Sequence, residues 1–512
     1  MLVKLSAYTI QGIEARTIEI EVHVTKGVNF YLVGLPDNAV KESQQRIYSA
    51  ISESGFKIPG KQCTINLAPA NLRKEGTAFD LGIALGILAA SNQIETQFLN
   101  RWAVLGELAL DGRIRSVTGV LPMAIQAKQD GLQGIIIPHV NAHEAAVVEG
   151  LEIIAVHTLK DAVTVLNGHS STAFTPCVDS PPFDCNVNTL DFADIKGQQV
   201  VKRALEIAAA GGHNVLLIGP PGAGKTMISK RLPGILPPLS RAESLETTRI
   251  YSVAGKLPQP ITGLVKERPF RSPHHTISNI ALVGGGNHPQ PGEISLAHNG
   301  VLFLDELPEF QRSALEVLRQ PMEERCVQIS RARYSINYPA NIMLIASMNP
   351  CPCGYYSHPE KHCSCNPAMV HRYLHKISGP LLDRIDLQIE VMPVQLHELE
   401  AKTKTESSSV IRKRVIQARN IQAQRFNNIP NVYCNAQMHE QLTEQYATLQ
   451  APAAALLKKA MTRLGLSARA YSRILKMSRT IADLENAEHI LTHHVAEAIQ
   501  YRTLDRTAWH AN

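Results

Sequence analysis

An apolar run that ends in a glycine-rich loop constrains the fold of this chain more than any other feature. Residues 214–218 form the run, and the loop matches the pattern G-x-x-x-x-G-K-[ST] with Gly219, Pro220, Pro221, Gly222, Ala223, Gly224, Lys225 and Thr226. Such a loop joins a buried strand to a helix, and its backbone N–H groups bind phosphates. The expected ligands are ATP, whose β and γ phosphates Lys225 would reach, and Mg²⁺, which the Thr226 hydroxyl would hold. The chain is therefore expected to contain an α/β nucleotide-binding core.

Two later apolar runs also end in polar side chains. Residues 301–304 precede Asp305 and Glu306, and residues 342–346 precede Asn349. Asp305 could orient the metal, while Glu306 could polarise the attacking water and Asn349 could orient it. Each run alone is better explained as a core strand followed by a turn. In this order, behind a phosphate loop, the three runs together predict ATP hydrolysis.

Length and composition limit the protein class. A chain of 512 residues exceeds what one hydrophobic core usually serves and suggests about three domains. It has no apolar run of membrane-spanning length, no signal peptide, and an odd number of cysteines, nine, so we expect a cytoplasmic protein without a membrane partner. The 51 Lys and Arg against 45 Asp and Glu give a net charge of +6, which permits an anionic polymer as partner.

Changes in composition divide the chain into segments. Residues 1–166 alternate strand and helix patterns, with a period-two strand at 17–22 and a helix at 37–54 that begins after Asp37. Residues 167–190 are rich in Pro, Gly, Ser and Asp and predict a linker. The predicted ATPase core is 191–394, and 395–512 predicts a small helical lid. Expected helices in these two segments are 199–210, 452–464, 468–485 and 492–504, and the basic stretch 411–426 predicts a solvated helix face.

Six motifs resemble the ComM/YifB family of magnesium-chelatase-like AAA+ ATPases over nearly the whole chain. They are DFADIKGQ at 191–198, the phosphate loop at 219–226, PFRSPHHT at 269–276, NGVLFLDE at 299–306, SMNPCPCG at 347–354 and GPLLDRID at 379–386. The resemblance implies an ATP-driven hexameric motor or helicase acting on single-stranded and branched DNA. Its expected task is branch migration in homologous recombination during natural transformation, with recombination proteins as further partners. It also implies a first-sensor role for Asn349.

The same resemblance assigns two arginines. Arg384 would be the arginine finger that reaches the γ-phosphate held by a neighbouring subunit, where a guanidinium stabilises the charge of the transition state. The alternative for Arg384 is a salt bridge to Asp383 or Asp386. Arg469 resembles the second sensor and would contact the nucleotide bound by its own chain, with Arg473 as the competing candidate.

A hairpin is expected between Glu306 and Asn349. Residues 327–330 and 334–337 alternate as strands, and Arg331 and Arg333 lie at the tip between them. Related ring ATPases point such a hairpin into the pore, where two arginines would bind the phosphates of DNA. The alternative is an exposed turn. A second glycine- and histidine-rich loop, residues 268–292, could also face DNA, and the alternative is that its adjacent histidines serve packing or hydrogen bonding.

Four cysteines close in sequence form a candidate zinc site. Cys351, Cys353, Cys363 and Cys365 could bind Zn²⁺ through four sulfurs. His358 or His362 could replace one sulfur, and a metal-free loop is the alternative. The role of such a metal would be structural, holding a loop beside Asn349.

The first segment resembles the proteolytic domain of Lon, at 74–82, 106–115 and 119–121. Hydrolysis by a serine and a lysine needs a hydroxyl nucleophile and an activating amine. Ala78 and Leu121 occupy these two places in the pattern, and Thr77 has no lysine at matching spacing. We expect a Lon-protease-like domain without a catalytic dyad, which binds DNA, a partner or the adjacent subunit.

Two other functions compete with a DNA motor. The first is the ATPase subunit of a metal chelatase or protein-remodelling complex, and absence of stimulation by DNA would favour it. The second is an ATP-dependent protease or unfoldase, which Ala78 and Leu121 argue against.

Overall fold

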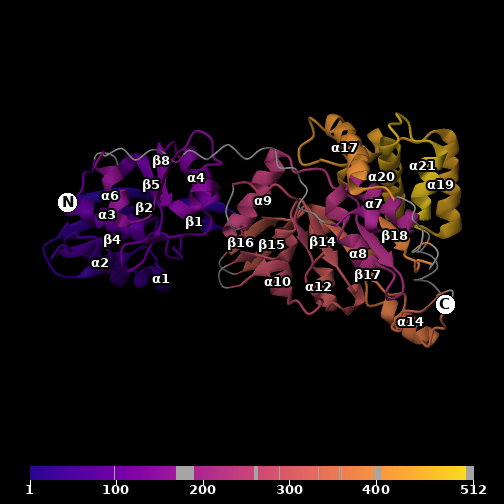
Figure 1. Cartoon of the computed structure of the whole chain (residues 1–512), viewed down its shortest axis with the longest axis horizontal. Helices are drawn as coiled ribbons and strands as arrows, with labels where there is room; N and C mark the ends of the chain where they lie inside the picture. The colour runs from indigo at the N-terminus through magenta and orange to yellow at the C-terminus, as the bar shows by residue number, and fades with distance from the viewer. Residues whose placement is uncertain are drawn as a thin grey trace. The chain divides into compact units, whose positions relative to one another are not determined.

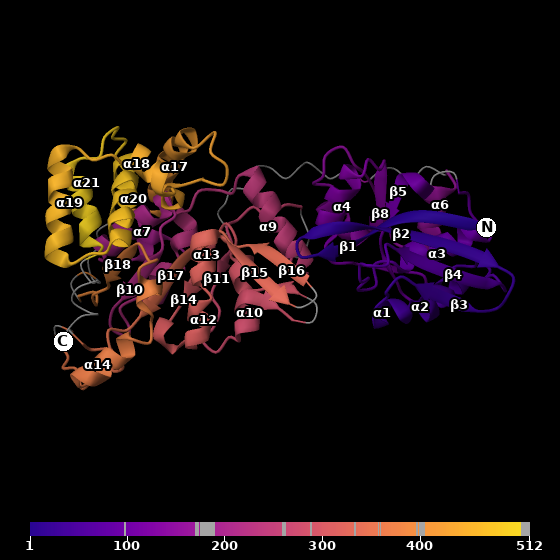
Figure 2. The same ribbon diagram turned by 180° about the vertical axis from the view of Figure 1, so that it is seen from behind.

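The chain folds into two compact units, which Figures 1 and 2 show from opposite sides. The first consists of Met1–Pro182 with Arg241–Val265, and the second of Phe183–Ser240 with Lys266–Asn512. This computed structural model describes residues 1–96, 99–168, 174, 190–258, 263–286, 289–331, 334–356, 358, 360–395, 398 and 405–502. Most of the predicted linker, 167–190, lies outside these described residues.

A seven-stranded mixed sheet forms the centre of the first unit, in the order β3-β4-β2-β1-β5-β8-β9. Its strands are β1 Leu2–Gln11, β2 Glu14–Thr25, β3 Phe30–Val33, β4 Gln62–Ala68, β5 Trp102–Val104, β8 Gly134–Pro138 and β9 Glu152–Val156. Strands β1, β2 and β4 pair antiparallel, and the other neighbours pair parallel. Ile18, Ile20 and Val22 are fully buried, as the period-two pattern predicted.

Helix α3 (Asp80–Ala90) is buried along its whole length. It lies close to the sheet because two glycines face β2: a Cβ on Gly82 would lie 2.8 Å from Ile20 Cδ1, and one on Gly86 would lie 2.5 Å from Val22 Cγ2. The other long helices of this part of the unit are α2 Ser43–Glu53, α4 Val120–Gln129 and α6 Leu159–Leu166. The helix predicted after Asp37 is divided into α1 (Asn38–Lys41) and α2, and the Asp37 side chain accepts the Val40 N–H.

Helix α9 (Arg241–Val253) comes from the middle of the ATPase sequence but packs in the first unit, against α4. The Ser252 hydroxyl donates to the buried Glu144 carboxylate, and the Ser252 carbonyl accepts the Gly119 N–H at 3.1 Å. The sequence predicted one continuous core at 191–394, whereas residues 241–265 of that range belong to the first unit. The helical pattern of α9 indicates a helix, but it does not specify which core receives it.

The second unit contains a five-stranded parallel sheet in the order β11-β14-β17-β10-β18. Its strands are β10 Val215–Ile218, β11 Phe270–Arg271, β14 Val301–Leu304, β17 Met343–Met348 and β18 Leu387–Glu390. The carboxyl ends of β10, β14 and β17 therefore meet at one edge of the sheet. Helix α7 (Gln199–Gly211) ends at Gly212, whose φ of 72° is the left-handed C-cap that the Gly-Gly pair predicted.

The helices that follow β18 pack beside this sheet, where α17 and α20 contact α7 and the other three pack through α20 and α21. They are α17 Ser408–Arg425, α18 Glu440–Tyr446, α19 Ala451–Leu464, α20 Ala468–Leu484 and α21 Thr492–Gln500. Buried side chains of α17, α20 and α21 share one hydrophobic core with those of β10 and β18. The expected α/β class, with C-terminal helices, is confirmed.

Candidate nucleotide site

The phosphate loop connects β10 to helix α8 (Lys225–Ser229) at the carboxyl edge of the parallel sheet. Gly222 and Gly224 have φ values of 80° and 86°, which glycine adopts without strain. The Lys225 ammonium donates to the Gly219 and Pro220 carbonyls at 2.7 and 2.9 Å. Burial lowers the pKa of Lys225, against the opposing effect of nearby carboxylates. The loop therefore holds its cation where phosphates would bind.

Asp305 connects the end of β14 to β17 and to helix α8. Its carboxylate accepts the Thr226 hydroxyl at 2.6 Å and also the Ser347 hydroxyl. Asn349, which follows β17, accepts from the Lys225 ammonium at 3.1 Å through its amide oxygen. Carboxylate and hydroxyl oxygens are ligands that Mg²⁺ prefers, so Asp305 and Thr226 fit the metal of a nucleotide complex. The structure thus brings together four of the residues that the sequence predicted for this site.

The Glu306 carboxylate contacts a residue outside this group. The φ of 54° at Glu306 is rare for a residue other than glycine, and its side chain is 55% exposed. The carboxylate lies 3.5 Å from His275 Nδ1. The sequence showed His275 only as part of a histidine-rich loop, and nothing in its spacing indicated this contact.

Arg384 and Arg469 lie near the amino ends of the sheet strands, whereas the phosphate loop lies at their carboxyl ends. Arg384 lies just before β18. Its carbonyl accepts a hydrogen bond of 3.3 Å from the side-chain amide of Asn214, the residue before β10. Its guanidinium is buried and pairs with Glu323 at 2.6 Å, so neither of the two aspartates considered from the sequence is its partner. Arg469 lies 3.4 Å from Asp383. This arrangement does not bring Arg469 to the nucleotide site of its own chain.

Arg473, the competing second-sensor candidate, lies at the same edge. It donates to the buried Asp386 carboxylate at 2.7 Å. Asp386 also accepts the Asn214 N–H at 2.8 Å. Burial alone would raise the pKa of Asp386, but Arg473, His213 and this N–H outweigh burial and lower it. Arg473 thus has a structural partner and joins α20 to the sheet.

The four cysteines form one cluster directly after Asn349. All four sulfurs lie within 4.8 Å of one another. Cys351 Sγ is 3.3 Å from Cys353 Sγ and 3.7 Å from Cys363 Sγ. A tetrahedral site with Zn–S bonds of about 2.3 Å has S···S edges of about 3.8 Å, so the donor set fits Zn²⁺. His358 is outside this cluster, because its Nδ1 accepts two backbone N–H groups.

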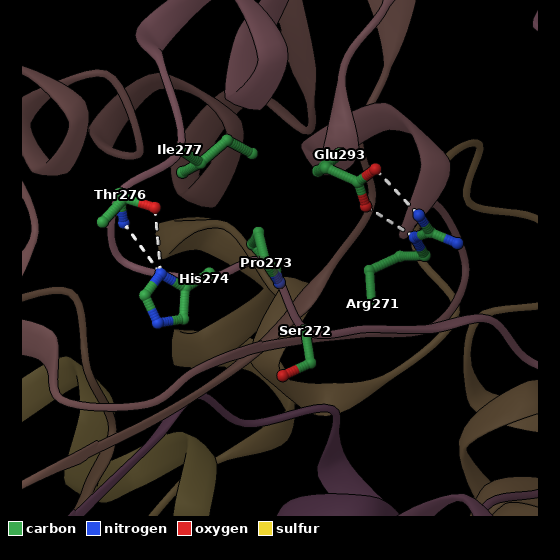
Figure 3. A pocket seen from close by; sticks show the side chains of 7 residues that line it. All are labelled: Arg271, Ser272, Pro273, His274, Thr276, Ile277 and Glu293. Carbon is green, nitrogen blue, oxygen red and sulfur yellow. Dashed lines mark hydrogen bonds and ion pairs between the residues drawn. The ribbon is translucent and has the colours of Figure 1, made fainter.

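The predicted DNA-binding positions are only partly described. Strands β15 (Cys326–Arg331) and β16 (Tyr334–Pro339) form the expected antiparallel hairpin. Arg333 and the side chain of Arg331 lie outside the described residues. In the second loop, Arg271 pairs with Glu293 through two contacts of 2.6 and 2.8 Å, which Figure 3 shows.

The basic stretch on α17 is not the solvated face that the sequence predicted. Arg414 pairs with Glu206 on α7, and Arg425 pairs with the buried Asp483 on α20 at 2.6 Å. Arg419 donates to the Ala209 carbonyl. Arg414 and Arg419 attach the lid to α7, and Arg425 joins two helices of the lid, which the local charge pattern could not indicate.

The first unit has the substitutions expected of an inactive Lon-like site. Leu121 is buried, and its N–H donates to Glu144 at 2.9 Å. Thr77 donates to the Glu107 carboxylate rather than to an amine. The Lys74 ammonium is bound to the Pro69 carbonyl. Within the described residues, no helix has the length and apolar character that a membrane span needs.

Known proteins resemble this chain along almost its full length. Residues 191–399 match the family "Magnesium chelatase, subunit ChlI", residues 405–502 its C-terminal family, and residues 20–141 the family "Subunit ChlI of Mg-chelatase". The chain is 46% identical to Competence protein ComM of Haemophilus influenzae, covering 97% of this chain and 96% of that protein. It is 44% identical to YifB of Salmonella typhimurium, covering 98% and 96%. Lon protease 2 of Bacillus subtilis is 28% identical over 29% of this chain and 25% of its own.

Proposed function

This chain belongs to the ComM/YifB family of magnesium-chelatase-like AAA+ ATPases, and we propose that it is a hexameric DNA motor that promotes branch migration. As a member of this family it is an ATP hydrolase. The proposed substrates are single-stranded and branched DNA in homologous recombination during natural transformation, with recombination proteins as partners. Near-full-length similarity to a protein named for competence is the observation that supports this task most directly.

The proposed chemistry uses the residues at the carboxyl edge of the sheet. Lys225 binds the β and γ phosphates, Thr226 and Asp305 hold Mg²⁺, and Asn349 orients the attacking water. The metal, when bound, neutralises charge on the phosphates. Glu306 takes up the proton of the water as general base. The bond between Lys225 and Asn349, at 3.1 Å, supports placing the cation and the water-orienting amide side by side.

We assign Arg384 and Arg469 to the site of a neighbouring subunit. Their place at the sheet edge opposite the phosphate loop supports action in trans, because a head-to-tail ring brings unlike edges of neighbours together. Two inactive variants test this: Lys225→Ala lacks a functional loop but keeps its arginines, and Arg384→Ala keeps its loop. Rings that mix the two variants should recover ATPase activity at each boundary where the intact loop of an Arg384→Ala subunit faces the intact arginine of a Lys225→Ala subunit. No recovery at any mixing ratio would exclude the trans assignment.

We propose that the β15–β16 hairpin contacts DNA through Arg331 and Arg333. Removing two phosphate contacts should lower DNA affinity and reduce its salt dependence by up to about two units of slope, while basal ATP turnover is retained. A matched control is Lys458→Ala with Lys459→Ala, two exposed cations on α19. Equal salt dependence in the two double variants would contradict the hairpin assignment.

The decisive experiment measures strand displacement on a labelled three- or four-stranded DNA junction with ATP. The parent chain should displace the strand, and Lys225→Ala should not. Lys230→Ala, an exposed lysine at the end of the same helix, serves as the control for charge. An ATPase that turns over normally but never displaces the strand would contradict the proposed motor.

We also propose that the cysteine cluster binds one structural zinc ion. Cys363→Ser should lose the metal and lower the melting temperature, because a closed structural zinc site stabilises the fold around it. Cys326→Ser is the matched control, since this free cysteine lies outside the cluster. Equal zinc content in the two purified variants would contradict the site.

A chelatase-type or protein-remodelling ATPase is the second candidate. The matches of three segments to chelatase subunit families favour it. Stimulation of ATP hydrolysis by DNA distinguishes the two functions, because only the motor requires it. Ala78 and Leu121 leave the first unit without groups for peptide hydrolysis, so we propose a binding role for it.

A further inference from the structure

The arginine that we assign to a neighbouring subunit is bound inside its own chain in this structure. The side chain of Arg384 is 7% exposed, and its guanidinium meets the Glu323 carboxylate at 2.6 Å. A second N–H of the guanidinium donates to the Pro380 carbonyl at 2.6 Å. A cation can reach a phosphate held by another subunit only from an exposed position. The side chain of Arg384 must therefore leave this position before it can act in trans.

The backbone of Arg384 is fixed, so the movement is confined to its side chain. Arg384 follows helix α15 (Gly379–Leu382), and its N–H donates to the Leu381 carbonyl at 3.0 Å. Its own carbonyl accepts the side-chain amide of Asn214. The long side chain can adopt another staggered rotamer from this fixed point. Release of the guanidinium thus needs no change in the segment that precedes β18.

The guanidinium is incompletely satisfied in its inward position. In the described part of the chain, Nε of Arg384 is buried and has no hydrogen-bond partner. A buried N–H without an acceptor costs free energy. A triphosphate carries more negative charge than the Glu323 carboxylate and offers several oxygens to the planar guanidinium. A nucleotide held by a neighbour can therefore compete with Glu323 for Arg384.

Glu323 can lose its partner at small cost because it remains close to water. It lies on helix α13 (Arg319–Glu324), and its side chain is 48% exposed. Opening the pair leaves a carboxylate that water can solvate, rather than a buried charge. An ion pair with one half-exposed partner contributes a modest free energy. The contact is thus suited to bias Arg384 inward and still to open.

We propose that Glu323 is a positioning residue that retains Arg384 inside its own chain until the nucleotide of a neighbouring subunit competes for it. The proposal rests on the proposed trans assignment and adds the regulation of that arginine. In a free subunit, Glu323 and the Pro380 carbonyl hold the guanidinium inward. When the ring closes, phosphates held by the neighbour's loop bind the guanidinium, and Glu323 is left in water. Each subunit boundary gains its arginine only when the neighbour holds nucleotide.

Rings that mix the Lys225→Ala and Arg384→Ala variants show which subunit the contact acts on. Only the Lys225→Ala chain supplies an arginine to these rings. Adding Glu323→Gln to that chain frees the arginine and should raise the ATPase rate about two- to fivefold, the size expected for a half-exposed ion pair. Adding Glu323→Gln to the Arg384→Ala chain should give no such rise, because the arginine is absent there. A merely structural role of Glu323 would affect both mixtures alike.

Glu324→Gln is the matched control. It removes the same charge from the next residue of α13, whose carboxylate accepts the Gln320 side-chain amide at 2.8 Å. Glu323→Asp keeps a carboxylate and should return most of the way to the rate of the mixture without a substitution at this position. The assay is steady-state ATP hydrolysis by equal amounts of the two full chains. KM for ATP should stay the same, because the intact loops are unchanged.

The outcomes separate the proposal from the function on which it rests. An equal rise in both mixtures would overturn the proposal, and so would an equal effect of Glu324→Gln. A recovered mixture whose rate Glu323→Gln leaves unchanged or lowers in the Lys225→Ala chain would overturn retention by Glu323 alone. If the starting mixture recovers no activity, the trans assignment fails, and retention by Glu323 fails with it.

Discussion

Replacing Asp386 by Ala should open the contact between the parallel sheet and helix α20. Asp386 is fully buried, and its carboxylate accepts the Asn214 N–H at 2.8 Å and Arg473 at 2.7 Å. One side chain therefore joins the amino ends of β10 and β18 to the lid. Alanine would leave a buried N–H and a mostly buried guanidinium without their acceptor.

The expected loss is about 3–5 kcal/mol, the cost of removing one partner of a buried ion pair. Asp386→Asn keeps an acceptor for the Asn214 N–H but loses the charge, so about half of this loss is expected. Asp383→Ala is the matched control. Its carboxylate is 35% exposed and faces Arg469, which is 59% exposed, so its removal should cost less than about 1 kcal/mol.

Amide hydrogen exchange measures this effect locally. A loss of about 3–5 kcal/mol corresponds to exchange that is about 150- to 5,000-fold faster in α20 and β18, since about 1.4 kcal/mol is one factor of ten. Peptides from α3, in the other unit, serve as the internal reference. Because the folded-state pKa of Asp386 is lowered, its contribution is fully present above about pH 4, its ordinary range, and is lost only in stronger acid. Equal exchange in Asp386→Ala and Asp383→Ala would refute the reasoning.

Three further predictions follow from burial and close packing. Lys476→Met should stabilise the second unit by up to about 3 kcal/mol near pH 7, because burial lowers the pKa of Lys476 to about 8. The gain should shrink between about pH 8 and 10.5, as the parent lysine loses its charge in the folded state. Urea unfolding of parent and variant at about pH 7 and about pH 10.5 tests this. Gly86→Ala should destabilise the first unit by about 1–3 kcal/mol, because the added methyl group would collide with Val22. Unfolding can be followed by the fluorescence of Trp102 on β5. In the control, Gly60→Ala, the methyl group meets nothing within 4 Å and should change stability by less than about 0.5 kcal/mol. Ser252→Ala removes a donor from buried Glu144 and should cost about 1–3 kcal/mol, measured as faster proteolysis next to α9; unchanged cleavage would contradict this.

The nucleotide site was predictable where its parts are local. The phosphate loop lies within eight consecutive residues, so its shape depends on the local backbone conformation that its glycines allow. Asp305 and Asn349 were predictable because each ends an apolar run, and parallel strands bring their carboxyl ends to one edge. The four cysteines lie close enough in sequence for their grouping to be expected, and the structure gives the sulfur distances.

Residues whose partners come from distant segments could not be placed in this way. The partner of Arg384 is Glu323 rather than either nearby aspartate, and Arg414 pairs with Glu206 on α7. For Arg384 the sequence offered two nearby aspartates, whereas the stretch 411–426 contains no carboxylate for Arg414. Packing of whole elements determined both partners, and no short pattern encodes that packing.

The sequence by itself determined the α/β class, the phosphate loop, the two carboxylates after β14 and the family, because these depend on periodicity and on contacts between neighbours in the chain. Only the tertiary structure decided that α9 folds with the first unit, that Arg469 lies opposite its own phosphate loop, and that His275 meets Glu306. These arrangements depend on the burial free energy of many side chains at once, which is spread over the fold and is not carried by any single segment.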